Sequence, residues 1–407
     1  MARVQWTDEY LTQQRQSADP IGDAAIRTIF ERRDIKELDA FMGRLVADDS
    51  IPADLPDEIR SFLAETSALP SWASVEQMRA AARLFNIYGG VSLASLVCAS
   101  LPQCYTMRTG VRILALTSQL GAHTNRRLHQ TAAMVMAVMG HHALEPDGYG
   151  VRQTQKVRLV HAAIRYRIMS ALGADGMSRA AGAEVPVLVQ GAVRSVNDVI
   201  AHAGFDWQIA RDGLPINQED LAFTLLTFGH VIPQSMRTLG VKLTNQEYEA
   251  FLHSWNVSGF VLGVNEDLMA HTVAEAEDLF ARIQARQAGP SPEGARLTDS
   301  LLRVVEKDIL RLPVLKPLGP VLTRVLVGDK TAAMLGLDVR HPRLVVGFHR
   351  LLAACVRVLQ IALSPLSQPF QPAAPLTARL GRRVVRCLCA ATDDGRLREV
   401  AIPPGWR

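Results

Sequence analysis

The chain of 407 residues contains 44 Lys and Arg against 40 Asp and Glu, and 48% of its residues are hydrophobic. Such a chain is long enough to bury a sizeable core without disulfides or metal sites to staple it. Because the basic residues are scattered, the sequence shows neither a nucleic-acid-binding stripe nor a polybasic membrane patch, and we expect no nucleic-acid partner.

Apolar residues recur mostly with a helical period, and strand-like alternation is scarce, so the sequence predicts an all-α protein. Several short helices are expected over residues 7–67, with a proline-rich break at 51–56. Ser74 is a candidate N-cap for a helix over 75–88, and small apolar residues predict another helix over 90–103.

The middle of the chain continues this helical pattern. We expect a helix over 111–122 and a second one that ends near Gly140. The turn EPDGYG then leads into the helix that carries His161. Thr244 and Glu247 form the capping-box pattern at the start of a later apolar helix.

Two proline-rich segments, residues 287–294 and 365–375, are predicted to be surface linkers. Together with the helical pattern they divide the chain into four predicted regions. These are an N-terminal helical extension (1–74), a core (75–286), a C-terminal helical part that packs on the core (295–364) and a C-terminal appendage (376–407).

The sequence carries no export or anchoring signal of the common kinds. Its first residues lack a signal peptide, and no apolar stretch matches the ~20 residues that a membrane-spanning helix needs. The five cysteines show neither C-x-x-C pairs nor a zinc spacing, which is typical of free thiols in a reducing compartment. We therefore expect a cytoplasmic protein without a transmembrane segment.

Histidine and arginine carry the clearest chemical signal, because the sequence has no Walker A motif, dinucleotide fingerprint, nucleophile elbow or H-E-x-x-H. Arg158, His161 and Arg165 fall within an arc of about 60° on one helix. This polar row borders an apolar stripe formed by Val157, Val160, Ile164 and Ile168. A hydrogen-bonded core histidine is the ordinary alternative to a ligand here.

A second polar row precedes it in the segment HTNRRLHQT. His123, Arg127 and Thr131 recur at i, i+4 and i+8, and Gln130 lies beside them. A guanidinium and a hydroxyl on a core-facing side are costly unless they meet an anion, a cofactor or other partners. The alternative is a helix-end salt bridge for Arg127 and a back-bonded hydroxyl for Thr131.

Several separated blocks of the chain resemble the latex-clearing-protein and MpaB-type oxygenases, which are helical b-type haem proteins. The blocks cover roughly residues 80–360 in the family's order and read RLHQT, VRLVHAAIR, PINQEDLAFTLLTFG, LHSWNVSGFVLGV and, more weakly, VLTRVLVGDKTAAMLGLD. The resemblance implies an all-α, globin-like haem-binding core with additional N- and C-terminal helices. It also implies haem b as the cofactor.

The same resemblance implies a role for the first polar row. In the latex clearing proteins the histidine of the H-A-x-x-R block is the proximal haem ligand, so the resemblance implies that His161 binds iron. Arg158 and Arg165 are then candidate donors of charge-assisted hydrogen bonds to the haem propionates.

On the distal side the family has an R-x-x-K-T motif, which here reads Arg127, Gln130 and Thr131. The lysine can itself occupy the sixth iron position in the latex clearing proteins, so Gln130 implies a water-bound or open distal site. An ungapped extension places Val111 where the family has a glutamate. His123 is a candidate for the missing base or donor, with a helix-end histidine as the alternative.

The main hypothesis is therefore a b-type haem-dependent oxygenase that uses O₂ on a small apolar substrate, terpenoid or lipid-like, with oxidative cleavage of a C=C bond as the reaction that the family suggests. Three alternatives remain. One is peroxide-dependent or non-oxygenative haem chemistry, and another is a non-catalytic helical ligand-binding protein. The third is a non-haem metal site built from Glu249, His253, Asp267, His271 and Glu275, although their i, i+4 spacing differs from the i, i+3 pairs of di-iron bundles.

Overall fold

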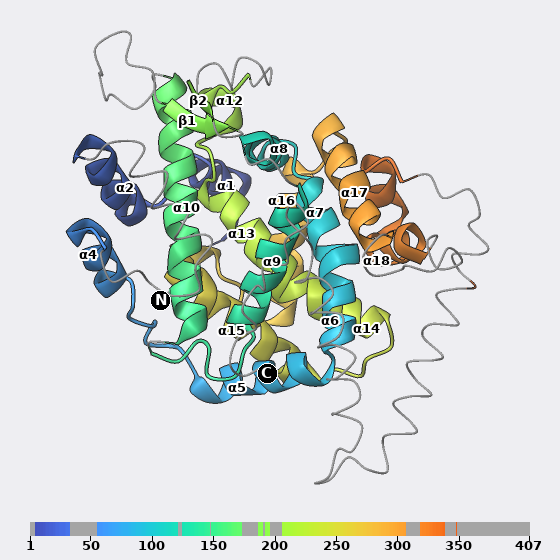
Figure 1. Cartoon of the computed structure of the whole chain (residues 1–407). Helices are drawn as coiled ribbons and strands as arrows, with labels where there is room; N and C mark the ends of the chain where they lie inside the picture. The colour runs from blue at the N-terminus through green and yellow to red at the C-terminus, as the bar shows by residue number, and fades with distance from the viewer. Residues whose placement is uncertain are drawn as a thin grey trace.

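The structure is a computed structural model, and apart from one short hairpin its regular elements are helices (Figure 1). In the hairpin, strands β1 (Pro186–Val189) and β2 (Ala192–Ser195) pair antiparallel. The prediction of an all-α protein is therefore confirmed. The residues that the structure describes are 5–32, 55–120, 124–146, 148–172, 186–189, 192–195, 206–306, 318–337 and 347. The predicted linker at 365–375 and the appendage at 376–407 lie outside these ranges.

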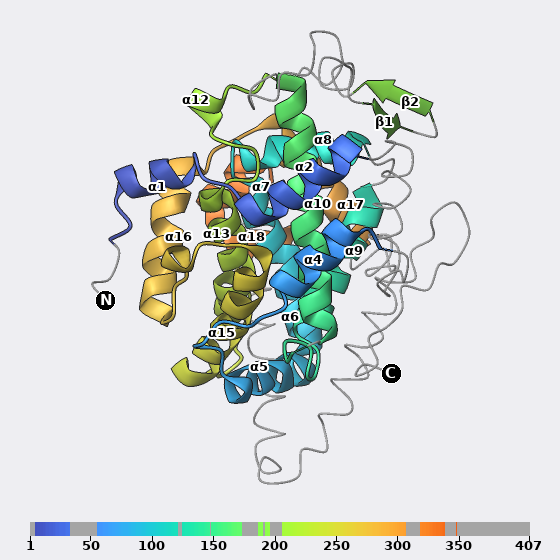
Figure 2. The same ribbon diagram turned by 90° about the vertical axis from the view of Figure 1, so that its left-hand side faces the viewer.

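In the described part of the N-terminal region, the helices are α1 (Asp8–Gln14), α2 (Pro20–Arg32) and α4 (Asp57–Glu65). Figure 2 shows α2 and α4 lying along the 24-residue helix α10 (Tyr149–Leu172). Their apolar side chains bury one face of α10, and the rings of Phe30 and Tyr166 stack with centroids 4.3 Å apart. The residues of this cluster are Ile26, Ile29, Phe30, Leu55, Ile59, Phe62, Leu159, Ala162, Ala163 and Tyr166.

The next helices contribute buried side chains to the main hydrophobic core. They are α5 (Val75–Ile87), α6 (Gly89–Ser95), the π-helical turn η1 (Leu96–Ser100) and α7 (Leu101–Tyr105). The side chain of Ser74 accepts a hydrogen bond from the backbone N–H of Gln77, which confirms the predicted cap. The helix predicted over 90–103 is interrupted by η1. Cys98 and Cys104 are buried in this segment and form no disulfide among the described residues.

The helices α8 (Gly110–Leu120) and α9 (Thr124–Val138) follow, and α9 packs against α10. Later helices complete the core. Helix α15 lies against both α5 and α10, and Thr244 and Glu247 form the predicted capping box at its start. These later elements are α12 (Ile209–Asp212), α13 (Gln218–Leu226), the π-helical turn η2 (Thr227–Val231), α14 (Ile232–Thr238), α15 (Asn245–Leu262), the 3₁₀ turn η3 (Glu266–Leu268), α16 (Val273–Gln287), α17 (Pro292–Val304) and α18 (Leu318–Met334).

The segment predicted as a surface linker at 287–294 is instead bound to the core. Ala288 forms an isolated antiparallel bridge with Met107, and the N–H of Gly289 donates to the carbonyl of Thr106 at 2.9 Å. Helix α17 then begins at Pro292, a residue whose fixed φ suits the first turn of a helix. The prolines therefore start a helix here and do not mark a linker.

Within the described ranges, no helix is by itself long and apolar enough to cross a membrane. Helix α5 and the run from Gly89 to Tyr105 reach that length and composition only as a pair, which is bent by 91°.

Candidate functional site

His161 lies on the less covered side of α10. Leu159, Ala162 and Tyr166 point toward α2 and α4 and are buried, whereas His161 is half-buried on the other side. Val157 and Ile164 share its helix face and are half-buried too, as are Thr131 and Met134 on the neighbouring helix α9. The histidine therefore lies among apolar groups that the protein covers only in part.

The residues predicted for the distal side fall on α9 or just before it. Arg127 and Gln130 belong to the first half of α9, but their side chains are outside the described part of the structure, and His123 lies outside it altogether. Thr131 is half-buried and described. Since α9 packs on α10, the two polar rows come from adjacent helices, and their predicted roles stay predictions.

Arg158 is buried and directed toward the N-terminal segment. Its Nε and Nη2 donate to the two carboxylate oxygens of Asp19, both at 2.7 Å, and its Nη1 donates to the carbonyl of Val261 at 3.0 Å. The guanidinium also lies 5.7 Å from the centre of the Phe62 ring. A fork-shaped guanidinium that meets a carboxylate in this way is held firmly in place.

Arg165 repeats this arrangement two turns later. Its Nε donates to both carboxylate oxygens of Asp23, at 2.9 and 3.1 Å, and its Nη1 donates to the carbonyl of Ile216 at 2.9 Å. Both arginines thus have partners within the protein. The contacts offer no support for the expectation that Arg158 and Arg165 bind propionates, and that role stays a prediction.

A buried acidic pair at the start of α13 is a feature that the sequence did not reveal. Glu219 is fully buried and bridges Arg15 and Arg286 at 3.2 and 2.9 Å. Burial, opposed by Arg15 and helped by the charge of Glu219, raises the pKa of the adjacent Asp220 to about 7. The only sequence signal was the segment NQED, which is equally typical of a helix start.

Asp220 also lies close to Gly110, the residue before Val111, which the sequence comparison predicts to stand where the family has a glutamate. Val111 is fully buried at the second residue of α8. A Cβ atom placed on the preceding residue, Gly110, would lie 3.8 Å from Cγ of Asp220. A carboxyl from another helix therefore stands beside an apolar residue at this end of α8.

The acids and histidines of the predicted non-haem metal site serve to hold helix ends. Glu275 accepts the N–H of His271 at 2.7 Å, Glu249 accepts the N–H of Val273 at 3.4 Å, and Nε2 of His253 accepts the N–H of Ser74 at 2.9 Å. Within the described ranges, no group of three or more His, Cys, Asp and Glu side chains could hold a metal ion. The non-haem alternative, including its Asp267, therefore has no support.

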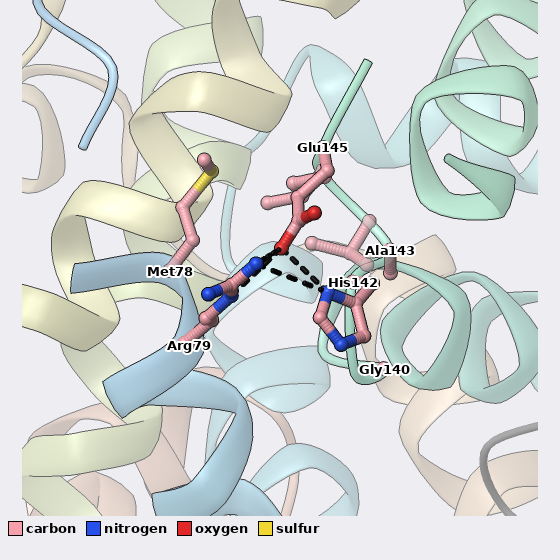
Figure 3. Close-up of a pocket in the computed structure, with 8 residues that line it drawn as sticks. Met78, Arg79, Gly140, His142, Ala143 and Glu145 are labelled. Carbon is pink, nitrogen blue, oxygen red and sulfur yellow. Dashed lines mark hydrogen bonds and ion pairs between the residues drawn. The ribbon is translucent and has the colours of Figure 1, made fainter. Parts of the chain in front are cut away.

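A small surface pocket lies between α5 and the turn that leads into α10 (Figure 3). Oε1 of Glu145 accepts a hydrogen bond from Nε of Arg79 at 2.8 Å and lies 2.6 Å from Nδ1 of His142. His142 lowers the pKa of this carboxyl, and Arg79 does so as well. These exposed groups tie the turn to α5 and show no separate chemistry.

The sequence that forms this mainly helical fold matches the model of a known family. The family described as "ER-bound oxygenase mpaB/B'/Rubber oxygenase, catalytic domain" matches residues 88–358, more than half of the chain. The chain belongs to this family and is an oxygenase. The predicted family is thereby confirmed, and the non-catalytic alternative is wrong.

Two similar proteins extend the comparison. The rubber oxygenase of Streptomyces sp. (strain K30) is 23% identical over 328 residues, which cover 78% of this chain and 70% of that protein. A solved structure of the latex clearing protein LCP in the closed state superposes with a TM-score of 0.68 at 22% identity, over 96% of this chain and 95% of that one. This second likeness shows that the two proteins share a fold.

Proposed function

We propose that the protein is a b-type haem-dependent oxygenase in which His161 is the axial iron ligand. The observation that carries the proposal is the position of His161, half-buried on the face of α10 that α2 and α4 do not cover. Imidazole is a common axial ligand of haem iron. The apolar side chains of Val157 and Ile164 beside it suit the face of a porphyrin, so this set of residues fits haem.

In this proposal each residue of the two polar rows has a limited task. The bound haem supplies the oxygen chemistry that no amino-acid side chain can perform. His161 would hold the iron, and Arg127 and Thr131 would offer hydrogen-bond donors to negative charge that develops during the reaction. Gln130 contributes an uncharged amide, which does not exchange a proton near neutral pH. His123 is the titratable group of this row.

The substrate that we propose is small and apolar, terpenoid or lipid-like, with an isolated C=C bond that is cleaved to carbonyl products. Membership of a family that includes a rubber oxygenase supports an apolar alkene. Oxygen consumption with a panel of such alkenes tests the reaction. If turnover requires added peroxide and consumes no O₂, the peroxide-dependent alternative replaces this part of the proposal.

The cofactor assignment is tested first by the absorption spectrum and the pyridine haemochrome of the purified protein. We expect a b-type haemochrome in the wild type and loss of haem, or a shifted spectrum, in His161→Ala. Arg127→Ala should keep haem and lose about 10²–10³-fold in kcat, the effect typical of removing one charge-stabilising donor.

The matched control is His142→Ala, since His142 is exposed at the surface pocket. It should keep both haem and spectrum. A His161→Ala protein with an unchanged haem spectrum would remove the ligand assignment.

A further inference from the structure

We propose that Asp19 and Asp23 are positioning residues for the iron ligand, acting through Arg158 and Arg165. This inference rests on the proposed function of His161. Both aspartates lie in the N-terminal segment, before the residues 88–358 that match the oxygenase family. The site would thus include a part of the chain outside the matched catalytic domain.

The two ion pairs bracket the histidine along the helix. Arg158 precedes His161 by three residues and Arg165 follows it by four, so the two guanidinium groups leave α10 about 10 Å apart along its axis. They lie on nearly the same face, adjoining that of the histidine. Two fixed points of this kind oppose both rotation of α10 about its axis and sliding along it. Either movement would displace the imidazole.

The pairs are well suited to hold a position because they are buried. The side chains of Asp19 and Arg158 are only 3% and 8% exposed, and those of Asp23 and Arg165 are 27% and 4% exposed. A buried charge that loses its partner raises the free energy of the folded protein, so arrangements in which either ion pair is broken are disfavoured. The carboxylate of Asp19 is itself fixed, because it accepts the N–H of Gly22 at 3.2 Å in the first turn of α2.

Gly22 allows α2 to approach α10 next to the histidine. A Cβ atom at this position would lie 2.4 Å from Oδ2 of Asp19 and 3.4 Å from Cβ of Ala162, the residue after His161. A larger residue would therefore push the carboxylate out of place or separate the two helices.

Each arginine also ties α10 to a third segment. Arg158 donates to the carbonyl of Val261 near the end of α15, where a cationic group is favoured. Arg165 donates to the carbonyl of Ile216, a β-branched residue with φ of +54°. This conformation is strained and persists only where neighbouring groups hold it. Helix α10 is thus held from two sides at each arginine.

The experiment compares Asp19→Asn and Asp23→Asn with wild type after loading with haemin. The readouts are the rate of haem loss to an excess of apomyoglobin, the electron paramagnetic resonance spectrum of the ferric protein, and the urea midpoint of the haem-free form. We expect haem loss to be faster by about 10- to 100-fold, as for other residues that orient a metal ligand, and the ferric spectrum to change. Asp23→Glu, which keeps the charge, should recover most of the wild-type behaviour.

Two controls separate positioning from simple packing. Asp8 lies in the same N-terminal segment as the two aspartates, and its exposed carboxylate pairs with Arg286 of α16. The variant Asp8→Asn should behave as wild type. Phe30→Leu weakens the α2–α10 contact without touching either ion pair. If Phe30→Leu speeds haem loss and alters the ferric spectrum as much as Asp23→Asn at the same loss of stability, the proposal is overturned.

The remaining outcomes also decide the matter. If Asp19→Asn fails to fold, Asp23→Asn gives the answer, since Asp23 is less buried. A folded Asp23→Asn with wild-type haem loss and ferric spectrum refutes the positioning role. His161→Ala is measured in parallel, and an unchanged haem spectrum in that variant refutes the proposed function. If His161→Ala loses the spectrum while the aspartate variants behave as wild type, only the positioning role of the aspartates is refuted.

Discussion

Asp220 is a buried carboxyl whose protonation changes close to neutral pH. Burial raises its pKa to about 7, and the only hydrogen bond to its side chain among the described residues comes from the amide of Asn217 at 3.0 Å. In the unfolded chain the same group has a pKa near 3.9. Folding therefore favours the protonated form of Asp220.

This shift predicts how stability depends on pH. Because the pKa of Asp220 is raised in the folded protein, its contribution to the free energy of unfolding is fully present below its unfolded pKa. This contribution is lost as pH rises through about 7. The variant Asp220→Asn stays neutral and lacks this loss. Between about pH 5 and about pH 8 we expect wild type to lose on the order of 2 kcal/mol relative to the variant, measured by urea unfolding.

The control for this measurement is Asp299→Asn, because Asp299 is 62% exposed and pairs with the exposed Arg303 one helical turn away. Its unfolding free energy should follow wild type across the pH range. Parallel pH profiles for wild type and Asp220→Asn would show that the carboxyl is ionised throughout.

At the scale of single residues, the sequence predicts what is decided locally. The cap at Ser74 and the capping box of Thr244 and Glu247 were predicted because each partner lies within one helical turn. The pairing of Asp19 with Arg158 spans 139 residues, and no local pattern marks it. The sequence placed the two arginines of α10 on a polar row that borders the apolar stripe, but their anions could not be found from spacing.

At the scale of elements, Gly263 determines how closely α15 approaches α10. It ends α15 with φ of +89°, and a Cβ atom there would lie 2.7 Å from Nε of Arg158. Gly263→Ala therefore combines an unfavourable backbone conformation with a collision against the buried guanidinium.

Gly336 offers a matched comparison, since its φ is +71° and among the described residues an added Cβ would meet only Ala295, at an ordinary 3.7 Å. Gly336→Ala should cost roughly 1–2 kcal/mol through the backbone alone. Gly263→Ala should cost about 1–3 kcal/mol more, because Arg158 must move. The free energy of unfolding of both variants is measured with guanidinium chloride. Equal losses of this free energy would mean that the Arg158 side chain moves aside without cost.

The two π-helical turns show why one predicted helix was only partly right. The turn Leu96–Ser100 comes just before Pro102, and the turn Thr227–Val231 comes just before Pro233. A proline lacks the amide proton and its ring collides with the carbonyl four residues earlier, so a wider turn there relieves the contact. The two prolines were visible in the sequence, but whether a helix widens or breaks depends on the packing of η1 against η2.

At the scale of the whole molecule, the core extends beyond the residues that match the family. Helix α5 precedes residue 88 and places Met78, Ala81, Leu84 and Phe85 in the main core. Without α5, α2 and the preceding Asp19, these apolar contacts and the partners of two buried arginines are missing together.

We therefore expect a chain that starts at residue 88 to lack a cooperative thermal transition in circular dichroism, because an uncompensated buried charge alone costs about 3–5 kcal/mol. A chain that starts at residue 5 is the control and should unfold as wild type does. Cooperative unfolding of the shorter chain at a similar temperature would show that the matched domain is stable on its own.

The distances in sequence between the partners of α10 affect the order of events during synthesis. Arg158 binds Asp19, which lies 139 residues before it, and Val261, which lies 103 residues after it. Bacterial and eukaryotic ribosomes add about 5–20 residues per second, and earlier segments fold while later ones are still being made. The helix of His161 thus gains the contact with Val261 only after α15 has emerged. Under the proposed function, insertion of the cofactor follows translation of most of the chain.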